Sequence, residues 1–403
     1  MRYRVSVSEA LQLVLADVSG VSAEHVPLPQ ALGRTLRTAI CSADDLPPFD
    51  NSAMDGFAVR SADCATLPVM LRIADTVTAG RMPGVPVTEG ACAAIMTGAP
   101  LPAGADTVVP VEWTELVEPG LVRIRRAPAK GVYVRRAGQE ARRGDTMLEA
   151  GLVISPQILG MAAGAGMHEV AVSRIPKVGV ISTGDEVYAG RGPLPEGKIR
   201  DINGIALAAL VTAAGGEPVG PRYARDDAGS VARIIELLLA QSNLLLISGG
   251  VSVGQHDLVR TVLKDMGLDM LLWRVRQRPG GPLAFGRLGG RAVFGLPGNP
   301  VSSAVCFDQY VRPFLAAMLR RMQVHRPRLW ATLSAPTPKK KGLHVFARGI
   351  YRSNAQGQLV VRDTGPQASS RYSSMTRANC IIHLEEEVEA APAGMRVAIE
   401  PLL

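Results

Sequence analysis

The segment Lys177–Val187, with the sequence KVGVISTGDEV, decides the interpretation of the fold. Its apolar run VGVIS at 178–182 is typical of a short strand that is buried on both faces. The polar sequence TGDE at 183–186 follows this run directly. Because ligands of open α/β sheets bind at the carboxyl ends of the strands, this junction indicates a site as well as a fold.

Alternating strand and helix patterns continue from this segment to about residue 322. The apolar run LLLIS at 244–248 predicts another buried strand, and a long helix with a kink at Pro313 is expected after Pro300. Apolar residues recur at helical spacing in three further segments: 207–214, 231–239 and 259–266. Repeated strand and helix units predict a mostly parallel, doubly wound sheet with helices on both faces.

The rest of the chain is divided into helical and β-rich parts. Ser6 and Glu9 predict a capped helix near the start, and Ser155 before Pro156 predicts another helix near 155–165. Short β-like runs fill the interval between the two, and five more follow residue 328. The predicted domains are a helical and linker domain (1–45 and 143–176), an inserted β-rich domain (46–142), an α/β domain (177–322) and a C-terminal β-barrel-like domain (328–403).

Composition excludes several classes of protein. The 403 residues are 47% hydrophobic and 20% charged, as in packed globular domains rather than disordered chains. No apolar run reaches the roughly 18 to 20 residues of a membrane span, and the start lacks the apolar core of a signal peptide. We therefore expect a cytoplasmic protein without membrane partners. The five cysteines are scattered singly, which argues against a cysteine-based metal site.

The net charge of +8 favours an anionic partner. We expect no nucleic acid, because the sequence has no RNA-binding signature, zinc finger or helix-turn-helix, and its basic residues are not gathered into one stripe. A small phosphorylated substrate agrees better with this charge.

Glycines and carboxylates recur after the predicted strands. The sequence GGVSVGQHD at 249–257 follows one strand, and Asp226 precedes a predicted helix. Each loop alone could be a simple turn or helix cap. Together, free backbone N–H groups beside carboxylates indicate phosphate bound with Mg²⁺.

Two other loops have an unusual concentration of polar or rigid residues. The segment 44–60, DDLPPFDNSAMDGFAVR, places Ser52 and Asp55 in a loop that could present polar groups to a ligand or could be an ordinary Ω-loop. The segment 296–302, LPGNPVS, joins a strand to a helix, and a ligand role would be additional to that structural one.

As a group, these motifs resemble one family, the molybdopterin molybdenumtransferases, which are MoeA-like proteins that include the E domain of gephyrin. The resemblance covers almost the whole chain, and the motifs occur in the family's order. They are PPFDNSAMDGFAVR, MTGAPLPAGADTVV, VRRAGQEARRGD, STGDEV, DINGIAL, SGGVSVGQHD, RPGGPLAFG and GLPGNPVSSAVCF.

This resemblance implies an elongated four-part subunit whose α/β domain is similar to MoaB and MogA and binds molybdopterin. It implies that the linker domain serves dimerisation, and that the active site lies between the α/β domain of one subunit and parts of the other. The implied reaction inserts molybdate, as a substrate, into adenylylated molybdopterin and releases AMP with the help of Mg²⁺. A molybdopterin adenylyltransferase and downstream cofactor-handling proteins are possible partners.

The resemblance also assigns site residues. The matching catalytic positions are Asp55, Thr97, Glu186, Asp226 and Asp257, of which Asp257, Glu186 and Asp226 are also metal ligands. The matching substrate-binding positions are Ser52, Arg135, Thr183, Gly184, Gly249, Gly250, Ser252, Gly254, Arg274, Arg278, Pro297 and Pro300.

The basic segment departs from the family pattern. Arg274, Arg278 and Gly281 stand where lysines are usual, and Glu140 stands where Asp is common. Two cations remain, and an arginine can bind an oxyanion through two hydrogen bonds. Two alternatives therefore stay open: adenylyl transfer to molybdopterin, and a cofactor-binding scaffold without catalysis.

Overall fold

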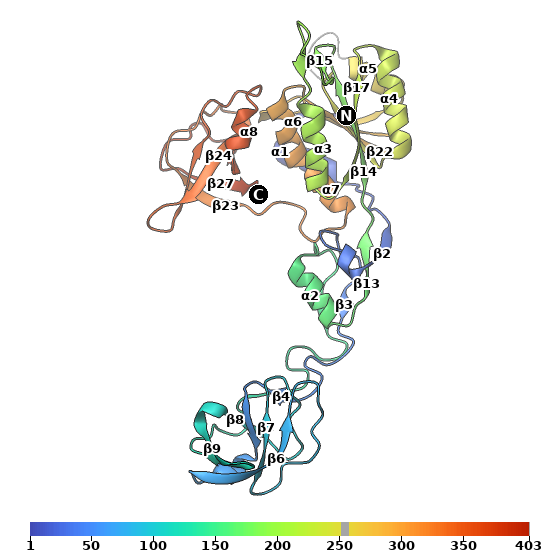
Figure 1. The fold of residues 1–403 in the computed structure, drawn as a ribbon. Helices are drawn as coiled ribbons and strands as arrows, with labels where there is room; N and C mark the ends of the chain where they lie inside the picture. The colour runs from blue at the N-terminus through green and yellow to red at the C-terminus, as the bar shows by residue number, and fades with distance from the viewer. Residues whose placement is uncertain (251–257, 403) are drawn as a thin grey trace.

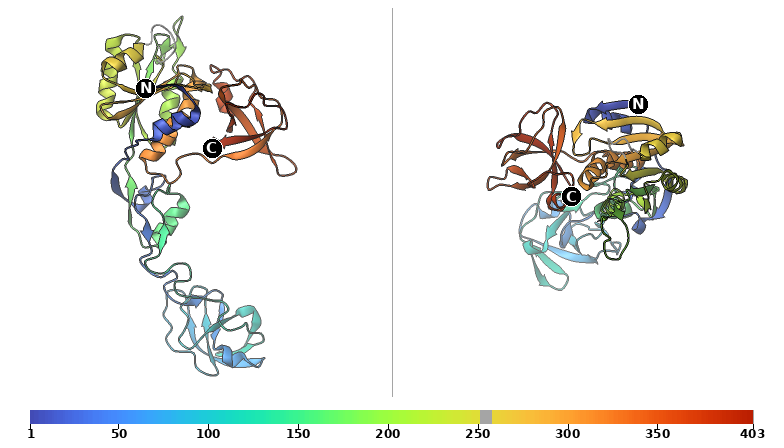
Figure 2. Two further views of the ribbon diagram at one scale, coloured as in Figure 1. Left: turned by 180° about the vertical axis from the view of Figure 1, so that it is seen from behind. Right: turned by 90° about the horizontal axis from the view of Figure 1, so that it is seen from above.

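The computed structural model describes residues 1–250 and 258–402. Figure 1 shows an elongated chain with the α/β domain at one end and the inserted β-rich domain at the other. The C-terminal β domain lies beside the α/β domain, as both views in Figure 2 also show. The expected combination of an α/β domain with two β-rich domains is confirmed.

A seven-stranded mixed sheet forms the centre of the α/β domain. Its order is β1-β19-β21-β22-β18-β14-β17, and β22, β18, β14 and β17 run parallel. The strands are β1 (Arg2–Val5), β14 (Lys177–Thr183), β17 (Glu217–Ala224), β18 (Leu244–Ser248), β19 (Asp269–Val275), β21 (Ala284–Leu288) and β22 (Arg291–Leu296).

Helices cover both faces of this sheet, as the sequence predicts (Figure 1). Alternate residues of one strand enter two different cores: Leu244 and Leu246 pack with α1, α3, α6 and α7, whereas Leu245 and Ile247 pack with α4 and α5. The helices are α1 (Val7–Leu15), α3 (Asn203–Ala213), α4 (Ala228–Gln241), α5 (Leu258–Asp265), α6 (Pro300–Cys306) and α7 (Arg312–Met318).

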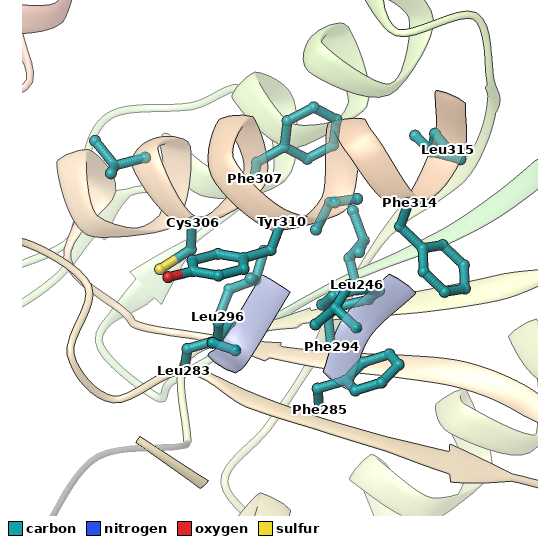
Figure 3. Packing of buried hydrophobic residues seen from close by; sticks show 14 of the residues in the cluster. Leu246, Leu283, Phe285, Phe294, Leu296, Cys306, Phe307, Tyr310, Phe314 and Leu315 are labelled. Carbon is teal, nitrogen blue, oxygen red and sulfur yellow. The ribbon is translucent and has the colours of Figure 1, made fainter. Parts of the chain in front are cut away.

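The long helix after Pro300 is interrupted differently from the prediction. A π-helical segment, η4 (Phe307–Val311), joins α6 to α7, and Pro313 lies in the first turn of α7. Apolar periodicity did not distinguish the π turn, because the whole segment is buried. Figure 3 shows Phe285, Phe294 and Phe314 packed below this helix, with ring centroids 4.8 to 6.0 Å apart.

The N-terminal residues belong to this sheet, although the sequence grouped them with residues 1–45. The predicted capping box is present, because Ser6 and Glu9 bond each other's backbone N–H at the start of α1. The chain nevertheless begins with strand β1, whose residue Tyr3 pairs in parallel with Trp273 of β19. The helix ends at Leu15.

The middle of the molecule connects the two ends through short elements. The predicted cap at Ser155 is confirmed, because its hydroxyl accepts from the Ile158 N–H at the start of α2. The elements are β2 (Ala23–Pro27), η1 (Leu28–Gln30), β3 (Ile40–Cys41), β12 (Thr146–Leu148), α2 (Pro156–Gly164) and β13 (Glu169–Ser173). Here β2 pairs with β13, and β3 pairs with β12.

The inserted domain contains a six-stranded sheet in the order β8-β5-β7-β6-β10-β9. Its strands are β5 (Gly56–Val59), β6 (Val69–Val77), β7 (Ala91–Ile95), β8 (Thr107–Pro110), β9 (Thr114–Glu118) and β10 (Leu121–Ile124). A separate pair joins β4 (Asn51–Ser52) to β11 (Val134–Arg135), and two short helical turns, η2 (Ser61–Cys64) and η3 (Val111–Trp113), complete the domain.

The C-terminal domain is a closed barrel of five strands, as expected from its strand spacing. Pairing of β24 with β26 closes the ring β24-β25-β23-β27-β26. The strands are β23 (Leu329–Leu333), β24 (His344–Ser353), β25 (Leu359–Asp363), β26 (Cys380–Leu384) and β27 (Arg396–Pro401), with the short helix α8 (Ser373–Arg377). A sixth strand, β20 (Gln277–Arg278), comes from the α/β segment and pairs with β24.

Buried charges join the barrel to the π-helical segment. Glu400 accepts from Gln309 at 3.1 Å and forms an ion pair with Arg328 at 3.2 Å; the ring of His383, whose pKa is lowered by burial, lies 3.3 Å from it. Burial alone would raise the pKa of Glu400, but His383, Gln309 and Arg328 lower it to about 2. Because a buried carboxylate is costly to leave without a partner, the hydrogen bond from Gln309, which comes from the α/β domain, holds the barrel to the π-helical segment.

No helix in residues 1–250 or 258–402 has the length and apolar character needed to cross a membrane.

Leu246→Ala should lower the free energy of unfolding of the α/β domain by about 2 to 5 kcal/mol, because a fully buried side chain would be replaced by a cavity. Urea unfolding followed by tryptophan fluorescence measures this loss. Leu237→Ala on α4, where the side chain is 45% exposed, should change the free energy far less. Equal losses of unfolding free energy in Leu246→Ala and Leu237→Ala would show that burial of Leu246 does not stabilise the domain.

Candidate functional site

A large pocket lies at the carboxyl ends of four parallel strands. Its volume is about 1070 Å³, and loops that follow β14, β17, β18 and β22 line it. The chain leaves β14 for β17 on one side and later enters β18 on the other side, so the pocket lies at a topological switch point. A cavity of this size and position is suited to a substrate that is as large as a nucleotide or a pterin.

Glycines form the wall of the pocket beside β18. Gly249 has φ +96°, and a Cβ there would lie 2.7 Å from the carbonyl oxygen of Thr183. Gly250 has φ +65°, and its Cβ would lie 2.2 Å from a methyl group of Val259. Only glycine fits this conformation and this close packing, so the backbone itself faces the pocket. Thr183, at the end of β14, is 5% exposed.

Carboxylates form another part of the pocket wall. The Asp185 and Asp226 side chains each accept the other residue's backbone N–H at 3.2 Å, which ties the loop after β14 to the loop after β17. Glu186 lies against Gly184 and lines the same pocket. Burial and the charges of these carboxylates raise the pKa of Tyr223, whose hydroxyl donates to the carbonyl of Gly184. Three negative groups therefore lie close together.

Asp201 and Asn203 are site residues that the sequence did not assign. Asp201 Oδ1 accepts from the Ser182 hydroxyl at 3.1 Å and from the Gly204 N–H at 2.8 Å. Asn203 Nδ2 donates to Ser248 Oγ at 2.8 Å and to the carbonyl of Gly298 at 2.7 Å. Both line the pocket. The motif DINGIAL contains both residues and is the sequence signal from which they could have been assigned.

The loop after β22 and the barrel close a further side. Pro297 and Pro300 line the pocket, as does Ser370 from the C-terminal domain. The Val301 N–H donates to the carbonyl of Ser369 at 3.1 Å, which holds the barrel loop against the start of α6. Ser370 could not be assigned from the sequence, because its position depends on how two domains pack.

The two arginines of the altered basic segment have different surroundings. Arg274 donates to the Tyr3 hydroxyl at 3.2 Å, near the edge strand β1. Arg278 is exposed, and the neighbouring residue Pro282 lines the pocket. Burial, and then the positive charge of Arg278, lower the pKa of Arg348 in β24 to about 10. Arg278 therefore lies close enough to Arg348 to oppose its positive charge, whereas Asp363 favours that charge.

A second polar cluster lies in the inserted domain, far from this pocket along the molecule (Figure 1). The backbone N–H and hydroxyl of Thr97 donate to Asp55 Oδ1 at 2.7 and 2.9 Å and hold the pKa of that carboxyl below its usual value. Ser52 lies in β4, which pairs with the strand of Arg135. Asp55, Thr97, Ser52 and Arg135 thus share one domain but do not reach the pocket of the same chain.

Three predicted site residues lie outside the described residues: Ser252, Gly254 and Asp257.

Three family models together match nearly the whole chain. The MoeA N-terminal region (domain I and II) matches residues 5–166, a probable molybdopterin binding domain matches 179–317, and the MoeA C-terminal region (domain IV) matches 331–402. The second match contains every strand-end loop of the pocket. The fold and the site therefore define a molybdopterin-handling protein of the MoeA type.

Known proteins agree over the same length. The chain is 36% identical to a molybdopterin molybdenumtransferase of Haemophilus influenzae, covering 94% of this chain and 93% of the relative. It is 35% identical to molybdopterin molybdenumtransferase 2 of Mycobacterium tuberculosis, with 98% of both covered. A crystal structure of the molybdopterin biosynthesis MoeA protein from Pyrococcus horikoshii matches with a TM-score of 0.86 at 29% identity, covering 99% of this chain and all of that one.

The chain belongs to the molybdopterin molybdenumtransferase family, as its motifs predict. It is a transferase of molybdenum cofactor biosynthesis.

Gly249→Ala should weaken molybdopterin binding at least about tenfold, because the new methyl group would push the glycine wall away from Thr183. Quenching of the pterin fluorescence measures the affinity. The matched control is Gly290→Ala, which has φ +77° but no atom within 4 Å of its Cβ. Equal affinities in the two variants would show that the glycine wall does not contact the ligand.

Proposed function

We propose that this transferase inserts molybdate into the dithiolene of adenylylated molybdopterin and releases AMP by hydrolysis. The pocket carries the proposal, because it combines a wall of exposed backbone with a wall of carboxylates in one cavity of about 1070 Å³. Backbone N–H groups favour phosphate, and the volume accommodates an adenylyl group together with a pterin. The positive net charge of the chain favours both anionic substrates.

The donor set of the pocket fits Mg²⁺. Glu186 and Asp226 offer hard oxygen atoms on one wall, and Asp201 adds a third carboxylate to the lining. Among residues 1–250 and 258–402 no three such side chains are close enough to hold a metal by themselves. Mg²⁺ typically uses one or two carboxylates and completes its shell with water and substrate phosphate. When bound, it would neutralise phosphate charge; Glu186 and Asp226 would hold it, together with Asp257 as a predicted third ligand.

A homodimer would bring the second polar cluster to the pocket. Asp55, Thr97 and Arg135 lie at the opposite end of an elongated chain from Glu186 and Asp226 (Figure 1). If all five serve one reaction, a second copy must supply one of the two groups. We therefore propose a homodimer with shared sites. We place it in the cytoplasm, where a molybdopterin adenylyltransferase would deliver the substrate and downstream cofactor-handling proteins would receive the product.

Arg278 is the proposed contact for molybdate. Of the two remaining arginines of the basic segment, it is the one whose loop reaches the pocket, through Pro282. Arg348 lies close enough to sense its charge, so a dianion here would meet the field of both side chains. Arg274 is instead bonded to Tyr3.

Purified protein should release AMP from adenylylated molybdopterin only when molybdate and Mg²⁺ are both present, and chromatographic measurement of AMP tests the proposal directly. Chelation of Mg²⁺ should abolish the release, because the carboxylate wall would then repel the phosphate. AMP release without molybdate would contradict molybdenum transfer. A protein that binds the pterin without releasing AMP would instead be a cofactor-binding scaffold.

Coexpression of two inactive variants should restore activity if the sites are shared. Asp55→Asn and Asp226→Asn each remove one half of the proposed site. Mixed dimers would keep one intact site, so coexpression should recover about a quarter of the parental rate, since random pairing puts half of the chains in mixed dimers. Solution mass should be twice 42.6 kDa. A monomer, or a mixture as inactive as its components, would exclude shared sites.

Arg278→Ala should raise the molybdate concentration for half-maximal AMP release at least about tenfold, because a charge-assisted contact to the dianion is lost. The matched control Arg274→Ala should have a much smaller effect. Titration at two ionic strengths should show the difference shrinking with salt. Identical molybdate titration curves for Arg278→Ala and the parent protein would show that Arg278 does not bind molybdate.

Gly281→Lys restores the family's usual charge and should lower the half-maximal concentration or leave it unchanged. The backbone at Gly281 needs no left-handed conformation, and a Cβ there would lie 3.2 Å from the carbonyl oxygen of Gln277, so the substitution requires a shift of a few tenths of an ångström.

A further inference from the structure

Three buried polar side chains meet beneath the loop 278–282, in a core that is otherwise apolar. Gln277 is 4% exposed, and Cys306 and Tyr310 are fully buried. Figure 3 shows the Tyr310 hydroxyl beside the sulfur of Cys306, with both side chains pointing away from the long helix. Burying an amide and a phenol is costly unless every polar atom has a partner, so these contacts require an explanation.

The hydrogen bonds of these side chains run from Tyr310 through Gln277 and Cys306 to the loop. The Tyr310 hydroxyl donates to Gln277 Oε1. Gln277 Nε2 donates to the carbonyl of Pro279 at 3.1 Å and to Cys306 Sγ at 3.6 Å. The Cys306 thiol donates to the carbonyl of Gly280 at 3.4 Å. The Gln277 amide and the Cys306 thiol therefore bind the carbonyl groups of two consecutive loop residues.

The direction of these bonds is determined by their chemistry. A carbonyl can only accept, so the amide nitrogen of Gln277 must face Pro279 and its oxygen must face the Tyr310 hydroxyl. Burial raises the pKa of Cys306 and the pKa of Tyr310, so both keep their protons. The thiol and the phenol can therefore serve as donors.

The loop fits this set closely. Gly280 has φ +88°, and a Cβ there would lie 2.5 Å from Cys306 Sγ and 2.8 Å from Gln277 Nε2. The backbone thus lies directly on the two donors. At its outer end, the carbonyl of Gly281 accepts from the N–H groups of Val275 and Leu283, each at 2.9 Å.

We propose that Gln277, Tyr310 and Cys306 form a polar clamp that positions the loop 278–282, and with it Arg278 and Pro282, for oxyanion binding. These are positioning residues, because they act through the loop backbone and do not line the pocket. The inference rests on the proposed oxyanion role of Arg278. With a lysine at position 281 the loop would carry two cations. Here it carries only Arg278, so oxyanion binding depends more strongly on the clamp.

The test compares three variants that keep the shape of the core. Gln277→Met removes the bonds to the loop, and Tyr310→Phe leaves the Gln277 oxygen without a donor. The double variant removes both polar partners and should recover thermal stability, since an apolar pair of the same shape leaves nothing unsatisfied. The double variant still lacks the hydrogen bond from position 277 to the Pro279 carbonyl. Phe314→Leu controls for general loosening, because it lies in the same core and helix but has no polar contact with the loop.

The first readout needs no substrate. Hydrogen exchange of the segment 274–283, which contains the Val275 and Leu283 amides, should become about tenfold faster in both single variants and in the double variant. Exchange there should be unchanged in Phe314→Leu. Parental exchange in the double variant, or equal acceleration in Phe314→Leu, would overturn the clamp.

The second readout is the molybdate titration of AMP release. The clamp variants should raise the half-maximal molybdate concentration about tenfold and leave the maximal rate within about twofold, because chemistry at the pocket is not touched. If Arg278→Ala shifts this concentration and the clamp variants do not, the positioning role is wrong. If Arg278→Ala has no effect, the oxyanion assignment is wrong, and the exchange measurement alone decides whether the clamp exists.

Discussion

Burial of both faces of β14 and β18 is the constraint on which the rest of the structure depends. Every residue of β18 is buried, and alternate side chains fill two separate cores. Such strands can offer polar groups to a ligand only where they end. Thr183, Gly184, Gly249 and the loop around Pro297 are therefore together because the strands stop at one edge, and the pocket is a product of the sheet.

The same constraint explains which parts of the fold the sequence predicts. The apolar runs of β14 and β18 and the caps at Ser6 and Ser155 are local signals, and the structure confirms them. Strand β1 was missed because four residues before a strong cap carry little periodicity, and its partner is some 270 residues away. The π-helical segment was missed because all its residues are buried, so no face distinguishes it.

The candidate site divides in a similar way. Glu186 and the glycines directly follow strands that the sequence predicts, so strand order is enough to predict that they meet. Asp226 follows β17, a strand that the apolar pattern did not predict, and its loop was recognised only from the helix after it. Ser370 and Arg348 belong to the barrel, and their contribution depends on contacts between the barrel and the α/β domain, such as that of Glu400 with Gln309. No motif records such packing. The family resemblance placed Asp55 and Thr97 in a site shared between two subunits, and the structure puts them in a different domain of the chain from the pocket (Figure 1).

The pairing of β1 with β19 also sets an order of events during synthesis. The strand that completes one edge of the central sheet is synthesised some 270 residues before its partner, Asp269–Val275, which follows after the inserted domain and most of the α/β domain. Contacts between such distant segments form late, because the closure of a long loop must be compensated by the contacts it allows. The inserted β-rich domain has its own sheet and cores, so it can fold while β1 and α1 are still unpaired. A nascent chain that stops before residue 269 therefore leaves the apolar face of α1, with Val7, Ala10 and Val14, without the residues of β19 and α7 that it packs against.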